Sequence, residues 1–222
     1  MKDVDDRWER ATRAAGATGG RRGQRAGRGA RWGLVACAAL ACGAGACARP
    51  PAERWCPPLA QGDLRVSELY AGDRAQGWEG WVEVFNATAQ DVELLGLAVR
   101  LRRLDGGAEQ RLLVRREVVL AGGGYGALSL STDAGRAAFA SYGLADVAPA
   151  SLYPAGAVQL ETCEVVVDRV RYAGLPSDGS LARGASSLGA AGGDDAGSWC
   201  EARAASAAEP PGTPGEENGP CR

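Results

Sequence analysis

Hydrophobic and polar positions alternate most regularly between residues 80 and 103, and this pattern predicts two strands joined by a turn. In the first strand, aromatic and β-branched residues at 81–85 suit a half-buried pleated surface, and Asn86 ends the run. In the second, Leu95, Leu97, Val99 and Leu101 fall on one face, opposite a face with arginines. A period of two is typical of a strand with one face in a core and one in water.

Shorter segments of the same kind follow in both directions, at 63–70, 111–120, 126–130, 158–160 and 164–172. Glycine-rich turns separate them, and the one at 121–125 lacks the Gly-Lys-Ser/Thr ending of a phosphate-binding loop. A short helix is predicted over 134–142. About seven short strands without a long amphipathic helix predict an all-β sandwich.

Three segments are predicted from the composition along the chain. Residues 1–48 combine a basic run with an apolar stretch of small residues, as in a bacterial export signal, and 49–62 form a proline-bearing linker. The apolar stretch is short for a membrane span, which needs about 20 residues. The alternative is a cytosolic chain with a disordered arm. Residues 63–222 form the domain.

The chain has seven cysteines, and their positions bear on the cellular compartment in which we expect it. A cysteine after small residues at the end of an apolar run resembles the lipobox of bacterial lipoproteins, in which that cysteine is lipidated. Cys47 is favoured because cleavage there leaves four further cysteines, an even number, while Cys42 stays an alternative. An ordinary cleavable signal peptide also remains open. We therefore expect an exported chain, either anchored to the envelope as a lipoprotein or secreted.

Cys56, Cys163, Cys200 and Cys221 are the disulfide candidates, because no pair has zinc-site spacing and the chain has no histidine. Their connectivity is not deducible. We expect Cys163 with Cys200, and Cys56 with Cys221, which would join the ends of the domain. Although the chain from residue 174 on is rich in glycine, alanine, serine and proline, Trp199 and these sulfurs predict an irregular tail pinned by disulfides.

Several of these segments together resemble the lamin-tail domain, whose bacterial members share motifs in the same order. Residues 64–69 are similar to its first strand, and 81–86 (WVEVFN) to its second. Further similar segments are 93–97, 120–125, 167–172, 180–183, Trp199, 213–215 and Asn218. Ser67 and Leu97 depart from the usual Asn and Trp, and residues 132–156 are not clearly matched.

The resemblance implies an immunoglobulin-like β-sandwich and no particular activity, because fold does not carry function. It implies a framework role for residues at the motif positions. These are Glu68, Trp81, Glu83, Asn86, Gly96, Asp168 and Trp199.

The absence of histidine excludes Ser-His-Asp and Cys-His nucleophile systems. Any catalysis would rest on carboxylates, of which Glu68 and Glu83 lie on strands expected to be neighbours, where a pair shares a proton or holds calcium. We expect such glutamates to bind loop amides instead. We predict no catalytic residue, metal site or cofactor. The weaker acidic candidates are Asp91, Glu93, Asp168 and the pair Asp194 and Asp195.

From Cys47 onward the chain has 16 arginines and 23 acidic residues, a formal charge of about −7, which argues against nucleic-acid binding. Arginines at 100, 102, 103, 111, 115 and 116 are expected on a solvated sheet face. We therefore expect a non-catalytic envelope module whose partner is an unidentified envelope protein or polysaccharide. The alternative is a metal-dependent hydrolase, or its accessory domain. Adhesion to carbohydrate would need Trp78 and Trp81 exposed on one side.

Overall fold

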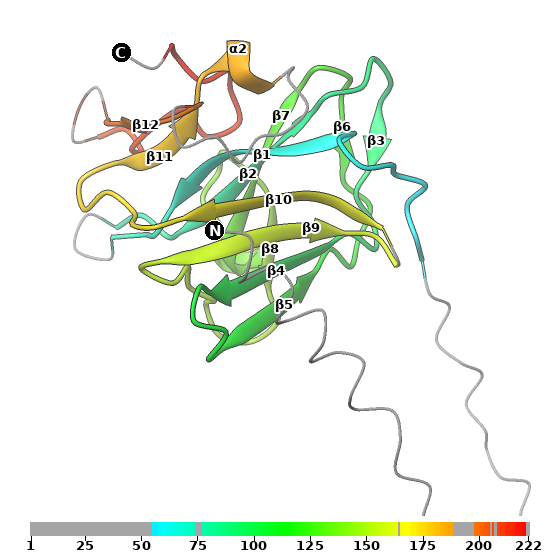
Figure 1. Cartoon of the computed structure of the whole chain (residues 1–222), viewed down its shortest axis with the longest axis horizontal. Coiled ribbons are helices and arrows are strands. Elements are labelled where there is room, and N and C mark those ends of the chain that lie inside the picture. The colour runs from blue at the N-terminus through cyan, green and yellow to red at the C-terminus, as the bar shows by residue number, and fades with distance from the viewer. Residues whose placement is uncertain are drawn as a thin grey trace, which may run out of the picture. The chain divides into compact units, whose positions relative to one another are not determined.

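Two β-sheets pack face to face in the computed structural model, which describes residues 55–73, 77–163, 165–188, 198–204, 206 and 208–220 (Figure 1). The six-stranded sheet has the order β12-β11-β1-β2-β7-β8, and the four-stranded sheet has the order β10-β9-β4-β5. The strands of the larger sheet are β1 (Leu64–Tyr70), β2 (Trp81–Asn86), β7 (Tyr125–Thr132), β8 (Ala140–Ala145), β11 (Ser180–Arg183) and β12 (Trp199–Ala202). Those of the smaller sheet are β4 (Ala98–Arg103), β5 (Glu109–Leu113), β9 (Gly156–Glu161) and β10 (Val166–Tyr172).

The core lies between the two sheets, where most inward positions are aliphatic. Val82 and Val84 of β2 are fully buried, as are Val99 and Leu101 of β4. Their spacing of two residues is the alternation that the sequence shows. The predicted all-β sandwich is confirmed.

The sequence predicted a hairpin from the two best-patterned strands, and this prediction is wrong. The two strands, β2 and β4, belong to different sheets. Between them the chain crosses the end of the sandwich through β3 (Val92–Glu93), which pairs with β6 (Val119–Leu120). Alternation fixes which side of a strand is buried, but it does not say which strand lies beside it.

Two element predictions are wrong in detail. The segment 111–120 is interrupted, with β5 ending at Leu113 and β6 beginning at Val119. In place of a helix over 134–142, a 3₁₀ turn at Asp133–Gly135 (η2) leads to β8, which pairs in parallel with β7. Tyr142 and Leu144 of β8 are buried in the core, so tertiary packing overrides the helical propensity of the alanines before them.

The domain includes residues before β1. Leu59 packs into the core, and the backbone at Trp55 crosses Gly96, whose φ of +86° and lack of a side chain permit this approach. The glycine-rich residues 121–124 form a turn between β6 and β7, as predicted, and β7 begins at Tyr125.

The disulfides differ from our expectation. Cys56 is bonded to Cys163, with Cα atoms 5.5 Å apart. This bond joins the segment before β1 to the β9–β10 connection. The expected pairs, Cys163 with Cys200 and Cys56 with Cys221, are therefore wrong in this structure. Cys200 in β12 is also disulfide-bonded, which confirms a pinned C-terminal segment.

Several predictions lie outside the described residues. They are the leader and its cysteines, Cys42 and Cys47, together with Cys221 and the pair Asp194 and Asp195. In the described part of the chain, no helix has the length and hydrophobicity that a membrane crossing requires.

Candidate functional site

The outer face of the six-stranded sheet, which points away from the core, carries the glutamate pair formed by Glu68 of β1 and Glu83 of β2. The two residues are direct partners in the antiparallel register. Because Val82 and Val84 point into the core, Trp81 and Glu83 point to the other side. Both glutamates are nevertheless fully buried, so another layer must cover this face.

A β-bulge in β1 aligns the pair. The register shifts between Val66 and Glu68, so Ser67 is the extra residue of the bulge. Its hydroxyl donates to Oε1 of Glu83 at 2.7 Å. Without this insertion the alternation that buries Leu64 and Val66 on the core side would place Glu68 there too.

The covering layer is the C-terminal cap, defined here as residues 212–218. The backbone N–H of Thr213 donates to Oε2 of Glu68 at 3.2 Å, and that of Gly215 donates to Oε2 of Glu83 at 2.6 Å. Asn218 donates through Nδ2 to the Ser67 carbonyl at 3.1 Å and to Glu83 Oε1 at 3.4 Å. Each carboxylate thus holds a different part of the cap on the sheet.

Burial dominates the electrostatics of the pair. Desolvation raises the pKa of Glu68 from 4.5 to about 7, against partly compensating hydrogen bonds. It raises the pKa of Glu83 to about 8, where the charge of Glu68 adds to the effect of burial. Two carboxylates this close do not ionise together readily, so the pair retains a proton at neutral pH.

An aromatic cluster continues this face beyond the pair. Trp81 is 1% exposed and its ring lies 4.3 Å from that of Tyr70, centroid to centroid. Phe139 meets Trp81 edge to face at 5.2 Å and lies 6.0 Å from Trp78. Because Trp81 is buried, the exposed pair of tryptophans required for carbohydrate adhesion is not formed.

Asp168 acts separately, as a link between the sheets. It lies on β10, and its Oδ2 accepts from the backbone N–H of Val66 at 2.8 Å. Burial raises its pKa, while the hydrogen bond from Val66 and the charges of Arg183 and Arg65 lower it. The carboxylate therefore satisfies a backbone donor at the bulge of β1.

Asn86 and Trp199 each make contacts that join separate segments of the chain. Asn86 is buried, and its Nδ2 donates to the carbonyls of Gln90, Leu120 and Ala121 at 2.8–3.0 Å, while Oδ1 accepts from the Thr88 backbone N–H. Trp199 packs at 5.5 Å from the buried guanidinium of Arg183. These residues hold the end of the sandwich and its C-terminal edge.

The remaining acidic candidates do not join the glutamate pair. Glu93 lies on β3, and Asp91 accepts from the Gly122 backbone N–H in a turn at 3.3 Å. Among the residues that the structure describes, no three histidine, cysteine or acidic side chains form a group suited to a metal ion.

Sequence reasoning missed the cap as the partner of the glutamates. Thr213, Gly215 and Asn218 were recognised as motif positions, but nothing in their spacing indicated which strand they would contact. The bulge carried a signal, since two polar residues in succession, Ser67 and Glu68, interrupt the alternation between Val66 and Leu69. Arg183, buried at 1% exposure on β11, was not singled out.

The chain was compared with known proteins. No protein-family model matches it, and no curated protein does either. The resemblance to the lamin-tail domain therefore stays a prediction that rests on residue motifs.

Proposed function

We propose that the chain is a non-catalytic, exported module of the lamin-tail type that serves a binding or structural role in the cell envelope. In this proposal it is anchored by a lipid at Cys47, with Cys42 as the alternative. The observation that carries the non-catalytic part is the use of Glu68 and Glu83 as acceptors for the C-terminal cap.

The geometry of the pair supports a framework role. A general acid or base must come within hydrogen-bonding reach of its substrate, and a metal ligand must turn a lone pair toward the ion. Glu83 instead receives donors on both oxygens, from Ser67, Gly215 and Asn218, and has no exposed surface. Displacing the cap to admit a substrate would leave these buried groups without their partners, at about 1–3 kcal/mol each.

The export part of the proposal is supported by the disulfides. Structural disulfides form and persist outside the reducing cytosol. The bond between Cys56 and Cys163 and the bonded state of Cys200 thus indicate an oxidising compartment. The basic run and apolar stretch before Cys47 supply a signal of the expected type.

Intact-mass measurement of the chain purified from the envelope fraction tests the anchoring. We expect a mass that begins at Cys47 and carries a lipid, and a shift on reduction that matches two disulfides. A lipidated mass that begins at Cys42 would support the alternative anchor. An unmodified N-terminus that retains residues 1–40 would overturn export. Affinity capture from solubilised envelopes then identifies the partner, an envelope protein or polysaccharide.

A metal titration separates this module from the hydrolase alternative. Ions that bind the folded state raise its melting temperature. We expect the same melting temperature in EDTA, millimolar Ca²⁺ and millimolar Mg²⁺. A rise with either ion that is lost in the variant Glu83→Gln would instead support metal binding by the glutamate pair.

A further inference from the structure

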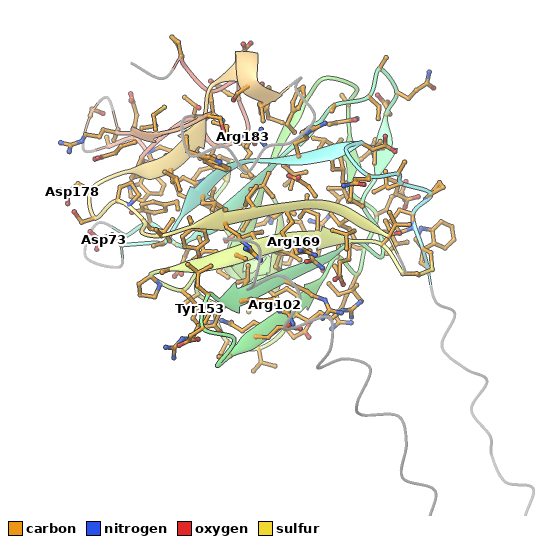
Figure 2. The ribbon with its side chains drawn as sticks, viewed as in Figure 1. Asp73, Arg102, Tyr153, Arg169, Asp178 and Arg183 are labelled. Atoms are coloured by element: carbon orange, nitrogen blue, oxygen red, sulfur yellow. A yellow bond between two sulfur atoms is a disulfide. The ribbon has the colours of Figure 1, made fainter. Side chains whose placement is uncertain are left out.

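The outer face of the four-stranded sheet carries rows of arginines. One row crosses the four strands of the sheet, with each residue directly opposite the next. Its members are Arg111 (β5), Arg100 (β4), Gln159 (β9) and Arg169 (β10). The next row contains Glu109, Arg102, Ala157 and Arg171 in the same strand order. We call these residues, with Glu161, the arginine face, and Figure 2 labels Arg102 and Arg169 on it.

Side-chain hydrogen bonds run across the arginine face. Arg169 donates through Nε to Gln159 at 2.8 Å, and Gln159 donates in turn to Glu161. Arg100 bridges Glu161 at 2.6 Å and Glu109 at 2.7 Å, and Glu109 also pairs with Arg102. This network holds the guanidinium groups of Arg100, Arg102 and Arg169 in place before any partner binds, which reduces the entropy lost on binding.

The arginine face opposes the charge of the rest of the chain. Five arginines stand against two glutamates there, although the chain from Cys47 onward has 23 acidic residues to 16 arginines. Arg115 and Arg116, which the sequence suggested for the same strip, lie beyond the end of β5 and pair with Asp146 and Asp133. Such segregation of charge favours an anionic partner on this face alone.

An apolar corner lies at one end of the arginine face. Trp55 is 52% exposed and Val165 is 39% exposed, and each lies within two residues of a cysteine of the Cys56–Cys163 disulfide. The connection that contains Cys163 follows Glu161, which pairs with Arg100. Tryptophan and arginine together are typical of protein surfaces at the membrane interface, where one end is apolar and the other meets headgroups.

We propose that the arginine face, with Trp55 and Val165 at its end, docks on the anionic headgroups of a lipid bilayer. The choice of a bilayer over a soluble polyanion rests on the proposed lipid anchor, because Cys47 is only eight residues before Trp55. Eight extended residues span at most about 28 Å, so an anchored domain is held beside the membrane. The apolar corner favours the same choice, because a soluble polyanion offers no hydrocarbon.

Arginine footprinting on the full chain tests this surface in vitro, independently of export or lipidation. Phenylglyoxal modification is mapped by mass spectrometry with phosphatidylglycerol vesicles, with phosphatidylcholine vesicles and with heparin. We expect the phosphatidylglycerol vesicles to protect Arg111 and Arg171 and to leave Arg203, which follows the edge strand β12, unprotected. Because every arginine is read separately, binding through the basic leader does not imitate this result. Equal modification with and without vesicles, or protection by heparin alone, would overturn the proposal.

A pair of matched variants supplies the second measurement. Arg111→Gln with Arg171→Gln should weaken binding to phosphatidylglycerol vesicles about five-fold for each arginine, by the usual strength of such contacts. Arg115→Gln with Arg116→Gln removes the same charge away from the face and should leave binding nearly unchanged. If both double variants weakened vesicle binding equally, the attraction would be non-specific, and this result would contradict docking through the arginine face. Unchanged melting temperatures establish that both pairs fold.

Discussion

Glu68 lies directly opposite Glu83 across β1 and β2, and each carboxylate accepts a backbone N–H from the C-terminal cap. Residues separated by more than 130 positions in the chain therefore meet at this pair, since Gly215 is 132 residues after Glu83. Like charges placed opposite each other in a sheet are destabilising unless one is neutralised. We therefore expect the attachment of the cap to depend on pH.

The first prediction concerns that dependence. Because the folded-state pKa values of Glu68 and Glu83, about 7 and about 8, exceed their unfolded values, the folded state binds more protons. The protons bound to Glu68 and Glu83 stabilise the folded state. This stabilisation is complete below about pH 4.5 and is lost as pH rises to about 8. We expect the free energy of unfolding to fall in this window by about 1.4 kcal/mol per pH unit for each proton concerned. Urea titrations at pH 5 to 9 measure the slope.

The double variant Glu68→Gln with Glu83→Gln is the control for this slope. Glutamine keeps the acceptor oxygen for the cap amides but has no proton to lose. Its unfolding free energy should be nearly constant from pH 5 to 9 and should exceed that of the wild type at pH 9. A wild-type slope that persists in the double variant would assign the dependence to other groups.

The second prediction concerns Gly212 at the start of the cap. Its φ is +80°, and a Cβ there would overlap Oε1 of Glu68 and the Ser180 hydroxyl. We expect Gly212→Ala to destabilise the fold by about 2–4 kcal/mol, through backbone strain and displacement of the cap. Gly219→Ala is the matched control, since nothing lies within 4 Å of a Cβ at that position. Equal melting temperatures for the two variants would contradict a tightly seated cap.

The sequence was informative wherever a feature depends on neighbouring residues in the chain. Alternation at Val99 and Leu101 identified the core side of β4, and Asn86 at the end of an aromatic run marked the end of β2. The sequence also led us to expect backbone amide donors at Glu68 and Glu83, and Thr213 and Gly215 supply them.

Pairings distant in sequence were not predictable. The disulfide partner of Cys56 depends on where the β9–β10 connection lies, and that depends on the order of strands in the smaller sheet. The assignment of β2 and β4 to different sheets is a similar case, because both strands show the same alternation. The cap escaped prediction because residues without a periodic pattern carry no signal for the surface that they cover.

The third prediction concerns Asn86, whose side chain joins two turns at the end of the sandwich. Asn86→Asp keeps the acceptor for Thr88 but loses the donors to Gln90, Leu120 and Ala121. It also buries a carboxylate beside carbonyl oxygens. We expect a loss of about 2–4 kcal/mol in the free energy of unfolding, and Thr88→Ala, a partly buried neighbour, should cost less. Greater destabilisation by Thr88→Ala would show that the hydroxyl, not the amide, organises these turns.

The last prediction distinguishes the two disulfide arrangements. In the structure Cys56 pairs with Cys163, 107 residues away, whereas the sequence led us to expect Cys221 as its partner. Alkylation of the folded variant Cys56→Ser, followed by peptide mapping, should therefore label Cys163. Label at Cys221 would instead support the pairing of Cys56 with Cys221 that the sequence led us to expect. Loss of a cross-link over so long a loop should also lower the unfolding free energy by about 2–5 kcal/mol. The double variant Cys56→Ser with Cys163→Ser should match the single one, because the second sulfur has already lost its partner.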